Sequence, residues 1–155
     1  MLSRTSQYAL RALIYLTQHE DEWPIPGTRI AREAGVPAKY LSKVLGDLVR
    51  SRVLDASPGR TGGFRLRRAP ERTFLIEVLT PFEHFDRREC PFGNHTCSDA
   101  RPCTAHHDWK KVVIAQKSFL SNTSLRDVAQ PMKTSRRTRN ANSTSPPSKA
   151  GKTQR

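Results

Sequence analysis

Residues 36–50, VPAKYLSKVLGDLVR, combine a strongly apolar stripe with a polar, basic face. The apolar residues recur at the three- and four-residue spacing of an amphipathic helix: Leu41, Val44, Leu45, Leu48 and Val49. Pro37 suits the first turn of such a helix, because its ring presets φ and its missing N–H is not needed there. The stretch therefore predicts a helix with one buried face and one outward face.

A shorter helix is predicted just before it, over residues 29–34, with Thr28 as its cap. Gly35 can close this helix at its C-terminal end. Two short helices joined by a turn of about three residues that contains glycine are typical of a helix-turn-helix. Ahead of the pair, apolar residues at helical spacing predict another helix over residues 3–18.

The residues after the pair predict a β-hairpin. Val53 and Leu54 are apolar, residues 57–63 hold three glycines and a proline, and Phe64–Arg67 alternate apolar with basic. A hairpin at this position is the wing of a winged helix-turn-helix. The predicted fold class is therefore mainly α with a small β-hairpin wing, and residues 1–83 form the DNA-binding domain.

Charge agrees with a nucleic-acid partner. The 155-residue chain carries a formal net charge of +13, and residues 28–68 hold ten basic side chains against three acidic ones. If the apolar stripe is buried, the outward face offers side chains for DNA bases or phosphates, and the hairpin tip adds another for the minor groove. These candidates are Lys39, Tyr40, Ser42 and Lys43 on the helix, Arg50 just beyond its C-terminal end for phosphates, and Arg60 at the tip. The ordinary alternative is a set of solvated surface charges.

The C-terminal part predicts a long helix over about residues 105–120 and a short one over 125–129. One side of the long helix is largely apolar, with Trp109, Val112 and Phe119 on it. Residues 131–155 are rich in serine, threonine and proline and hold seven basic but no acidic side chains. We expect them to be a disordered basic tail, either solubilising or adding affinity by neutralising phosphates.

Residues 84–108 predict a long loop that holds all three cysteines of the chain, in the pattern Cys90-x6-Cys97-x5-Cys103-x2-His106. Three thiolates and an imidazole can fill a zinc site, but zinc sites usually take cysteines in close pairs. Wide spacing suits an iron–sulfur cluster better. Three is also an odd number, which argues against a secreted disulfide framework.

Several stretches together resemble the Rrf2 family of bacterial winged-helix transcription regulators, which includes the iron–sulfur cluster regulator and the nitric-oxide-sensitive repressor. The matching residues are Ser6-Gln7-Tyr8-Ala9-Leu10-Arg11-Ala12-Leu13, Val36-Pro37-Ala38-Lys39-Tyr40-Leu41-Ser42-Lys43, Gly59-Arg60-Thr61-Gly62-Gly63-Phe64 and the three cysteines. The resemblance covers about residues 1–130.

This resemblance implies a homodimer that binds a palindromic double-stranded DNA operator. It also implies a cluster, 2Fe–2S or 4Fe–4S, held by Cys90, Cys97 and Cys103, whose occupancy alters DNA affinity. His106 matches the histidine ligand of the iron–sulfur regulator branch, with His107 as the neighbouring candidate. In a dimer, residues 105–130 are expected to pack against the partner.

Other function classes fit less well. There is no long apolar run for a transmembrane helix and no secretory signal at the start, so we expect a cytoplasmic protein without membrane association. No nucleophile elbow or phosphate-binding loop is present, so we expect no enzyme. The leading expectation is a cluster-controlled regulator that acts as a repressor. The alternative is a winged-helix regulator that uses its cysteines as a thiol switch or zinc site.

Overall fold

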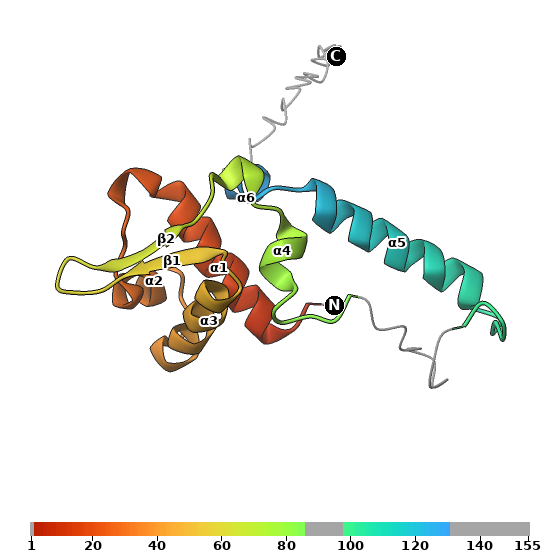
Figure 1. Ribbon diagram of the computed structural model, residues 1–155. Helices are drawn as coiled ribbons and strands as arrows, with labels where there is room; N and C mark the ends of the chain where they lie inside the picture. The colour runs from red at the N-terminus through yellow and green to blue at the C-terminus, as the bar shows by residue number, and fades with distance from the viewer. Residues whose placement is uncertain (1, 86–97, 131–155) are drawn as a thin grey trace, which may run out of the picture.

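The computed structural model of the chain describes residues 2–85 and 98–130. A winged helix-turn-helix is followed by a long helix that extends away from it, on the side opposite to the hairpin (Figure 1). The elements run in the order α1 (Arg4–Gln18), η1 (Glu20–Glu22), α2 (Gly27–Glu33), α3 (Ala38–Arg50), β1 (Leu54–Ser57), β2 (Gly63–Leu66), η2 (Pro70–Arg72), α4 (Leu75–Leu79), α5 (His106–Asn122) and α6 (Leu125–Ala129). The predicted fold class is confirmed, and the predicted tail, residues 131–155, lies outside the described residues.

Helix α1 is the centre of the core. The Ser3 side chain caps it by accepting a hydrogen bond from the Ser6 backbone N–H at 3.2 Å. Its apolar face is buried among α2, α3, α4 and α6, and comprises Ala9, Ala12, Leu13 and Leu16. The DNA-binding elements and the C-terminal helix α6 therefore share one hydrophobic core.

The helix-turn-helix consists of α2 and α3. Helix α2 begins at Gly27, because the Pro26 carbonyl accepts from Arg29 and Ile30, so the prediction that Thr28 caps it was wrong. Gly35 has a φ of +62°, a backbone conformation that side-chain-bearing residues rarely adopt. The predicted apolar stripe of α3 is buried, with Leu41, Val44, Leu45 and Leu48 at most 2% exposed.

The hairpin pairs β1 with β2 in antiparallel register, with Leu54 opposite Leu66. Its two adjacent glycines are set by close backbone contacts. A Cβ on Gly62 would lie 2.1 Å from the Ser57 carbonyl oxygen, and one on Gly63 would lie 2.4 Å from the Ile25 backbone. Both positions therefore require glycine, one for the turn of the wing and one for the close approach of β2 to the residue 25 backbone.

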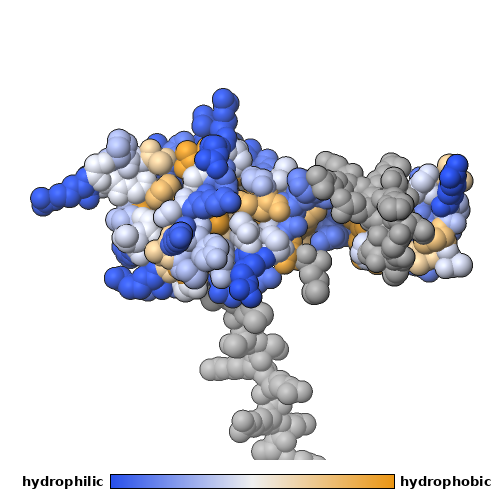
Figure 2. Space-filling view, turned by 90° about the horizontal axis from the view of Figure 1, so that it is seen from below, coloured by the Kyte–Doolittle hydropathy of each residue, from blue (hydrophilic) through white to orange (hydrophobic). Residues whose placement is uncertain are grey.

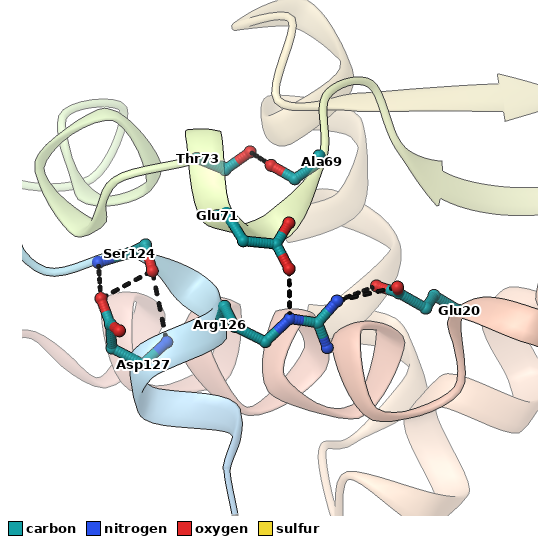
Figure 3. Close-up of polar contacts among 7 residues, drawn as sticks. All are labelled: Glu20, Ala69, Glu71, Thr73, Ser124, Arg126 and Asp127. Carbon is teal, nitrogen blue, oxygen red and sulfur yellow. Dashed lines mark hydrogen bonds and ion pairs between the residues drawn. The ribbon is translucent and has the colours of Figure 1, made fainter.

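Helix α5 returns to the domain at its C-terminal end. The Leu75 N–H donates to the Thr123 carbonyl at 3.0 Å, and the Leu125 N–H donates to the Thr73 carbonyl at 2.8 Å. Ser124 caps α6, as the cap geometry with Asp127 shows in Figure 3. Backbone hydrogen bonds thus fasten α5 and α6 to the segment that follows the wing.

A side-chain cluster reinforces this attachment. Arg126 donates from Nε to Glu71 at 2.6 Å and from a terminal nitrogen to both oxygens of Glu20, at 2.8 and 2.7 Å (Figure 3). We call Glu20, Glu71 and Arg126 the Arg126 joint. It connects α6 with η1, just after α1, and with η2, just after the wing.

Candidate DNA interface and cysteine-loop site

The outward face of α3 is polar and exposed. Lys39, Tyr40, Ser42 and Lys43 are all exposed, because the apolar stripe turns the opposite side of the helix into the core. Figure 2 shows the molecule from below, turned by 90° from the view of Figure 1. Hydrophilic side chains project from this face, which includes α3 and the wing. These four predicted residues therefore lie together on one free surface at the N-terminal half of α3.

Tyr40 makes a contact that the sequence did not predict. Its side chain is 62% exposed, and its ring centroid lies 6.3 Å from that of Tyr8 in α1. The sequence pattern placed Tyr8 only on the apolar face of the first helix, and nothing in that pattern distinguishes a core tyrosine from one that supports a neighbour. The neighbouring Ser42 hydroxyl donates to the Ala38 carbonyl at 3.0 Å.

Two further predicted DNA contacts differ in their surroundings. Arg60 is exposed in the turn between β1 and β2, as predicted. Arg50 was expected beyond the helix end but is the last residue of α3, where it forms an ion pair with Asp47. The Arg50 side chain is 73% exposed, so it can exchange Asp47 for a DNA phosphate at little cost.

The wing carries two more arginines. Arg65 and Arg67 are exposed, and their guanidinium groups lie 3.7 and 3.8 Å from Asp55 on the paired strand. The alternation of apolar and basic residues after Gly63 indicated this surface, although no role was assigned to either side chain. The hairpin therefore presents a basic edge beside α3.

Of the predicted cluster ligands, Cys103 and His106 fall within the described residues, whereas Cys90 and Cys97 lie outside them. Cys103 is half-buried and forms no disulfide. His106 begins α5, is only 4% exposed, and donates its backbone N–H to the Cys103 carbonyl at 3.0 Å. One turn of chain thus joins the backbones of Cys103 and His106, while the alternative ligand His107 is exposed.

A carboxylate and an ammonium group adjoin the buried imidazole. Asp99 Oδ1 lies 2.8 Å from His106 Nε2, and Lys110 Nζ donates to both Asp99 oxygens at 2.8 and 3.0 Å. Lys110 first, and His106 second, lower the pKa of Asp99 from its usual 3.8 to about 2. No sequence pattern indicated this contact, although Asp99 lies between two cysteines in the chain.

The described residues fit the iron–sulfur group that the resemblance implies. A thiol and an imidazole are ligand types found in iron–sulfur proteins, and His106 is held buried within one turn of Cys103. Within residues 2–85 and 98–130, no group of three histidine, cysteine or acidic side chains is close enough to bind a metal ion. A metal site with three or more such ligands would therefore need at least one residue from outside these ranges.

A second polar contact lies at the other end of the cysteine loop. The Glu83 carboxylate accepts from the Ser6 hydroxyl and the Ser3 backbone N–H, both at 2.6 Å. Burial acts to raise the pKa of Glu83, but these hydrogen bonds from Ser6 and Ser3 outweigh it and lower the pKa. Gln7, one residue further along α1, donates to the Leu2 carbonyl at 3.1 Å.

Helix α5 exposes apolar side chains. Val112, Ile114 and Phe119 are 54%, 59% and 58% exposed, and only His106 and Leu120 of its 17 residues are buried. None of the described helices is long and apolar enough to cross a membrane. An apolar, water-exposed face on a long helix is typical of a protein–protein contact.

Known proteins match most of the chain. A model of the Rrf2 family, described as an iron-dependent transcriptional regulator, matches residues 2–131. The HTH-type transcriptional regulator IscR of Xenorhabdus nematophila is 27% identical over 130 residues, which cover 83% of this chain and 79% of that protein.

Solved structures agree with this match. The chain is similar to T. potens IscR, with a TM-score of 0.68 and 21% identity over 83% of this chain and 85% of that one. It is also similar to CymR, the global cysteine regulator of B. subtilis, with a TM-score of 0.70 and 21% identity over 83% and 95% of the two chains. These matches are to regulators, so the prediction that the chain is not an enzyme is confirmed.

Proposed function

The chain belongs to the Rrf2 family of transcriptional regulators, and from that premise we propose that it is a DNA-binding repressor controlled by an iron–sulfur cluster. The ligands would be Cys90, Cys97, Cys103 and His106. The observation that carries this proposal is the burial of the His106 imidazole at the start of α5, where the His106 backbone N–H donates to the Cys103 carbonyl. When bound, the cluster would supply a redox-sensitive link between the cysteine loop and α5.

The DNA contacts follow from the exposed side of the helix-turn-helix. The N-terminal half of α3 would enter the major groove, where Lys39, Ser42 and Lys43 reach base edges and Tyr40 packs beside them. Arg60 at the wing tip would enter the adjacent minor groove, whose negative potential attracts a guanidinium group. Residues 1–83 would thus read the operator.

A homodimer would cover the apolar face of α5. Val112 and Phe119 are seven residues apart on α5, so their exposed side chains share one face of the helix, which a second copy of the chain can bury. Two copies would present two wings and two copies of α3 to a palindromic operator. Residues 105–130 would then be the dimerisation segment, and the regulator would act in the cytoplasm.

A change at the cysteine loop, residues 84–108, would reach the DNA through α5. The loop joins the first turn of α5, and the last turn of α5 is fastened to Thr73 and Leu75 by backbone hydrogen bonds. The Arg126 joint adds ion pairs to η1 and η2. A displacement of α5 would therefore shift the segment that directly follows β2 of the wing. The basic tail, residues 131–155, would add phosphate contacts without sequence preference.

The test is anaerobic purification followed by a visible absorption spectrum, with iron, acid-labile sulfide and zinc quantified on the same sample. We expect visible absorbance with matched iron and sulfide in the wild type, its loss in Cys97→Ala, and a strong reduction in His106→Ala. His107→Ala is the matched control, because it removes the adjacent, exposed imidazole.

A colourless protein that contains zinc, or no metal after reconstitution, would overturn the cluster proposal. It would favour the zinc-site or thiol-switch regulator instead. An equal loss of absorbance in His107→Ala and His106→Ala would overturn the assignment of His106 as the fourth ligand.

A further inference from the structure

We propose that Asp99 is the positioning residue for His106, fixing its ring so that Nδ1 is the nitrogen presented to the cluster. Lys110 in turn holds Asp99 in place. The inference rests on the proposed function, since it assigns a role toward the same ligand. Asp99 is not one of the four proposed ligands, but it lies between Cys97 and Cys103 in the sequence.

The contact geometry is specific. One carboxylate oxygen of Asp99 lies 2.8 Å from His106 Nε2, and the same oxygen accepts from Lys110 Nζ at 2.8 Å. His106 and Lys110 are four residues apart on α5, so their side chains share one face of the helix. A single carboxylate from the cysteine loop therefore binds two neighbouring side chains of the first helical turn.

Burial separates this contact from an ordinary surface ion pair. The Asp99 and Lys110 side chains are 56% and 50% exposed, and a pair like that alone contributes little to stability. The His106 side chain is only 4% exposed, so the ring edge that meets Asp99 belongs to a buried imidazole. The Asp99 contact therefore acts on a ring whose surroundings already restrict its motion.

The chemistry of imidazole explains why orientation matters. A neutral histidine carries one N–H, and an ionised carboxylate can only accept hydrogen bonds. Asp99 therefore selects the form of His106 with the proton on Nε2, which leaves Nδ1 unprotonated for coordination. Carboxylates or carbonyls that accept from the second nitrogen of a metal-binding histidine commonly fix its tautomer and raise its basicity.

The first test uses the cluster-free protein and does not depend on loading. In protein labelled with ¹⁵N at histidine, two-bond ¹H–¹⁵N correlations report which ring nitrogen of His106 is protonated. We expect the Nε2–H form in the wild type and a mixture of forms in Asp99→Ala. Asp108→Ala is the matched control, because this exposed aspartate lies in the first turn of α5 and pairs with Lys111 at 2.9 Å.

The second test uses the loaded protein. Removing a group that orients a metal ligand typically costs 10–100-fold in metal affinity, so we expect cluster release to a chelator to be about 10–100-fold faster in Asp99→Ala. Lys110→Met should give a smaller acceleration, and Asp108→Ala none. In the double variant Asp99→Ala/His106→Ala, loss of Asp99 should add nothing to the loss of His106.

The outcomes separate the two proposals. A wild type without a cluster would overturn the proposed function and, with it, the ligand role of His106. A wild type with a cluster, whose release rate and His106 tautomer are both unchanged in Asp99→Ala, would overturn only the role of Asp99. Additive effects in the double variant would also overturn it, because Asp99 would then act independently of His106.

Discussion

Helices α3 and α5 contain similar numbers of apolar residues but bury them to different extents. Helix α3 has 13 residues and buries four of them, including Leu45 and Leu48, against the rest of the same chain. Helix α5 has 17 residues and buries only His106 and Leu120. The difference teaches that α3 is positioned by its own domain, whereas most apolar side chains of α5 stay exposed among the described residues, where the proposed second copy of the chain would cover them. The proposed cluster ligand His106 is the first residue of this less buried helix.

The largest effect we expect is on α3. Leu45 is 1% exposed, so Leu45→Ala removes buried methyl groups and leaves a cavity in the core. We predict a loss of about 2–5 kcal/mol in the free energy of unfolding, measured by urea denaturation. A loss below about 1 kcal/mol would mean that α3 is not firmly packed, and would remove the contrast between the two helices.

The next largest effect concerns α5. Phe119→Glu places a charge on the exposed apolar face, and its burial in a dimer would be costly. We predict that the dimer dissociation constant rises at least about 30-fold, the equivalent of ~2 kcal/mol, in analytical ultracentrifugation. The helical content by circular dichroism should stay unchanged.

Ser118→Glu is the control for this change, because its exposed side chain is adjacent in sequence and about a quarter turn away around the helix. A wild type that is monomeric at all concentrations, or equal weakening by both variants, would contradict the dimer assignment.

A moderate effect is expected at the DNA-binding face. Lys43→Ala should cost about 1–3 kcal/mol of operator binding if it contacts a base, measured by fluorescence anisotropy. Arg60→Ala should also weaken binding, most strongly on operators with a narrow minor groove beside the half-site. Lys111→Ala, an exposed lysine on α5, is the control and should bind like the wild type. Unchanged affinity for both Lys43→Ala and Arg60→Ala would refute the assigned interface.

The smallest effect is expected at Glu83, where the DNA-binding domain meets the cysteine loop. Glu83 has a lowered pKa in the folded chain, so its carboxylate contributes stability that is present above its unfolded pKa near 4.5. This contribution is lost as the pH falls through the lower folded value. Glu83→Gln should therefore show a smaller drop in melting temperature between pH 6 and pH 3 than the wild type. Asp21→Asn is a control of equal charge change; an equal reduction in both would contradict the role of Glu83.

The sequence predicted the regions where packing decides the structure. Apolar spacing in residues 36–50 predicted α3, its buried residues and its exposed candidates, because helical periodicity and burial are one and the same constraint. The adjacent glycines predicted the wing. Each of these features is local in sequence and repeated over several residues.

Contacts between distant polar residues could not be predicted in this way. Asp99 meets His106, and Glu83 meets Ser6, through single side chains whose approach depends on the path of the chain. The end of α3 was also misjudged, because Arg50 is still helical and pairs with Asp47 within the last turn. Helix ends depend on one or two hydrogen bonds, which composition alone does not specify.

The central claim is that occupancy of the cysteine-loop site controls operator binding. The direct measurement is the dissociation constant for DNA, obtained by anaerobic fluorescence anisotropy on one preparation before and after removal of its cluster. The DNA is a duplex that the untreated protein has selected from a pool of random sequences. Cys97→Ala serves as a permanently cluster-free comparison. The account predicts at least a tenfold difference in dissociation constant between the two forms, with Cys97→Ala matching the stripped protein. Equal dissociation constants for all three samples would contradict it.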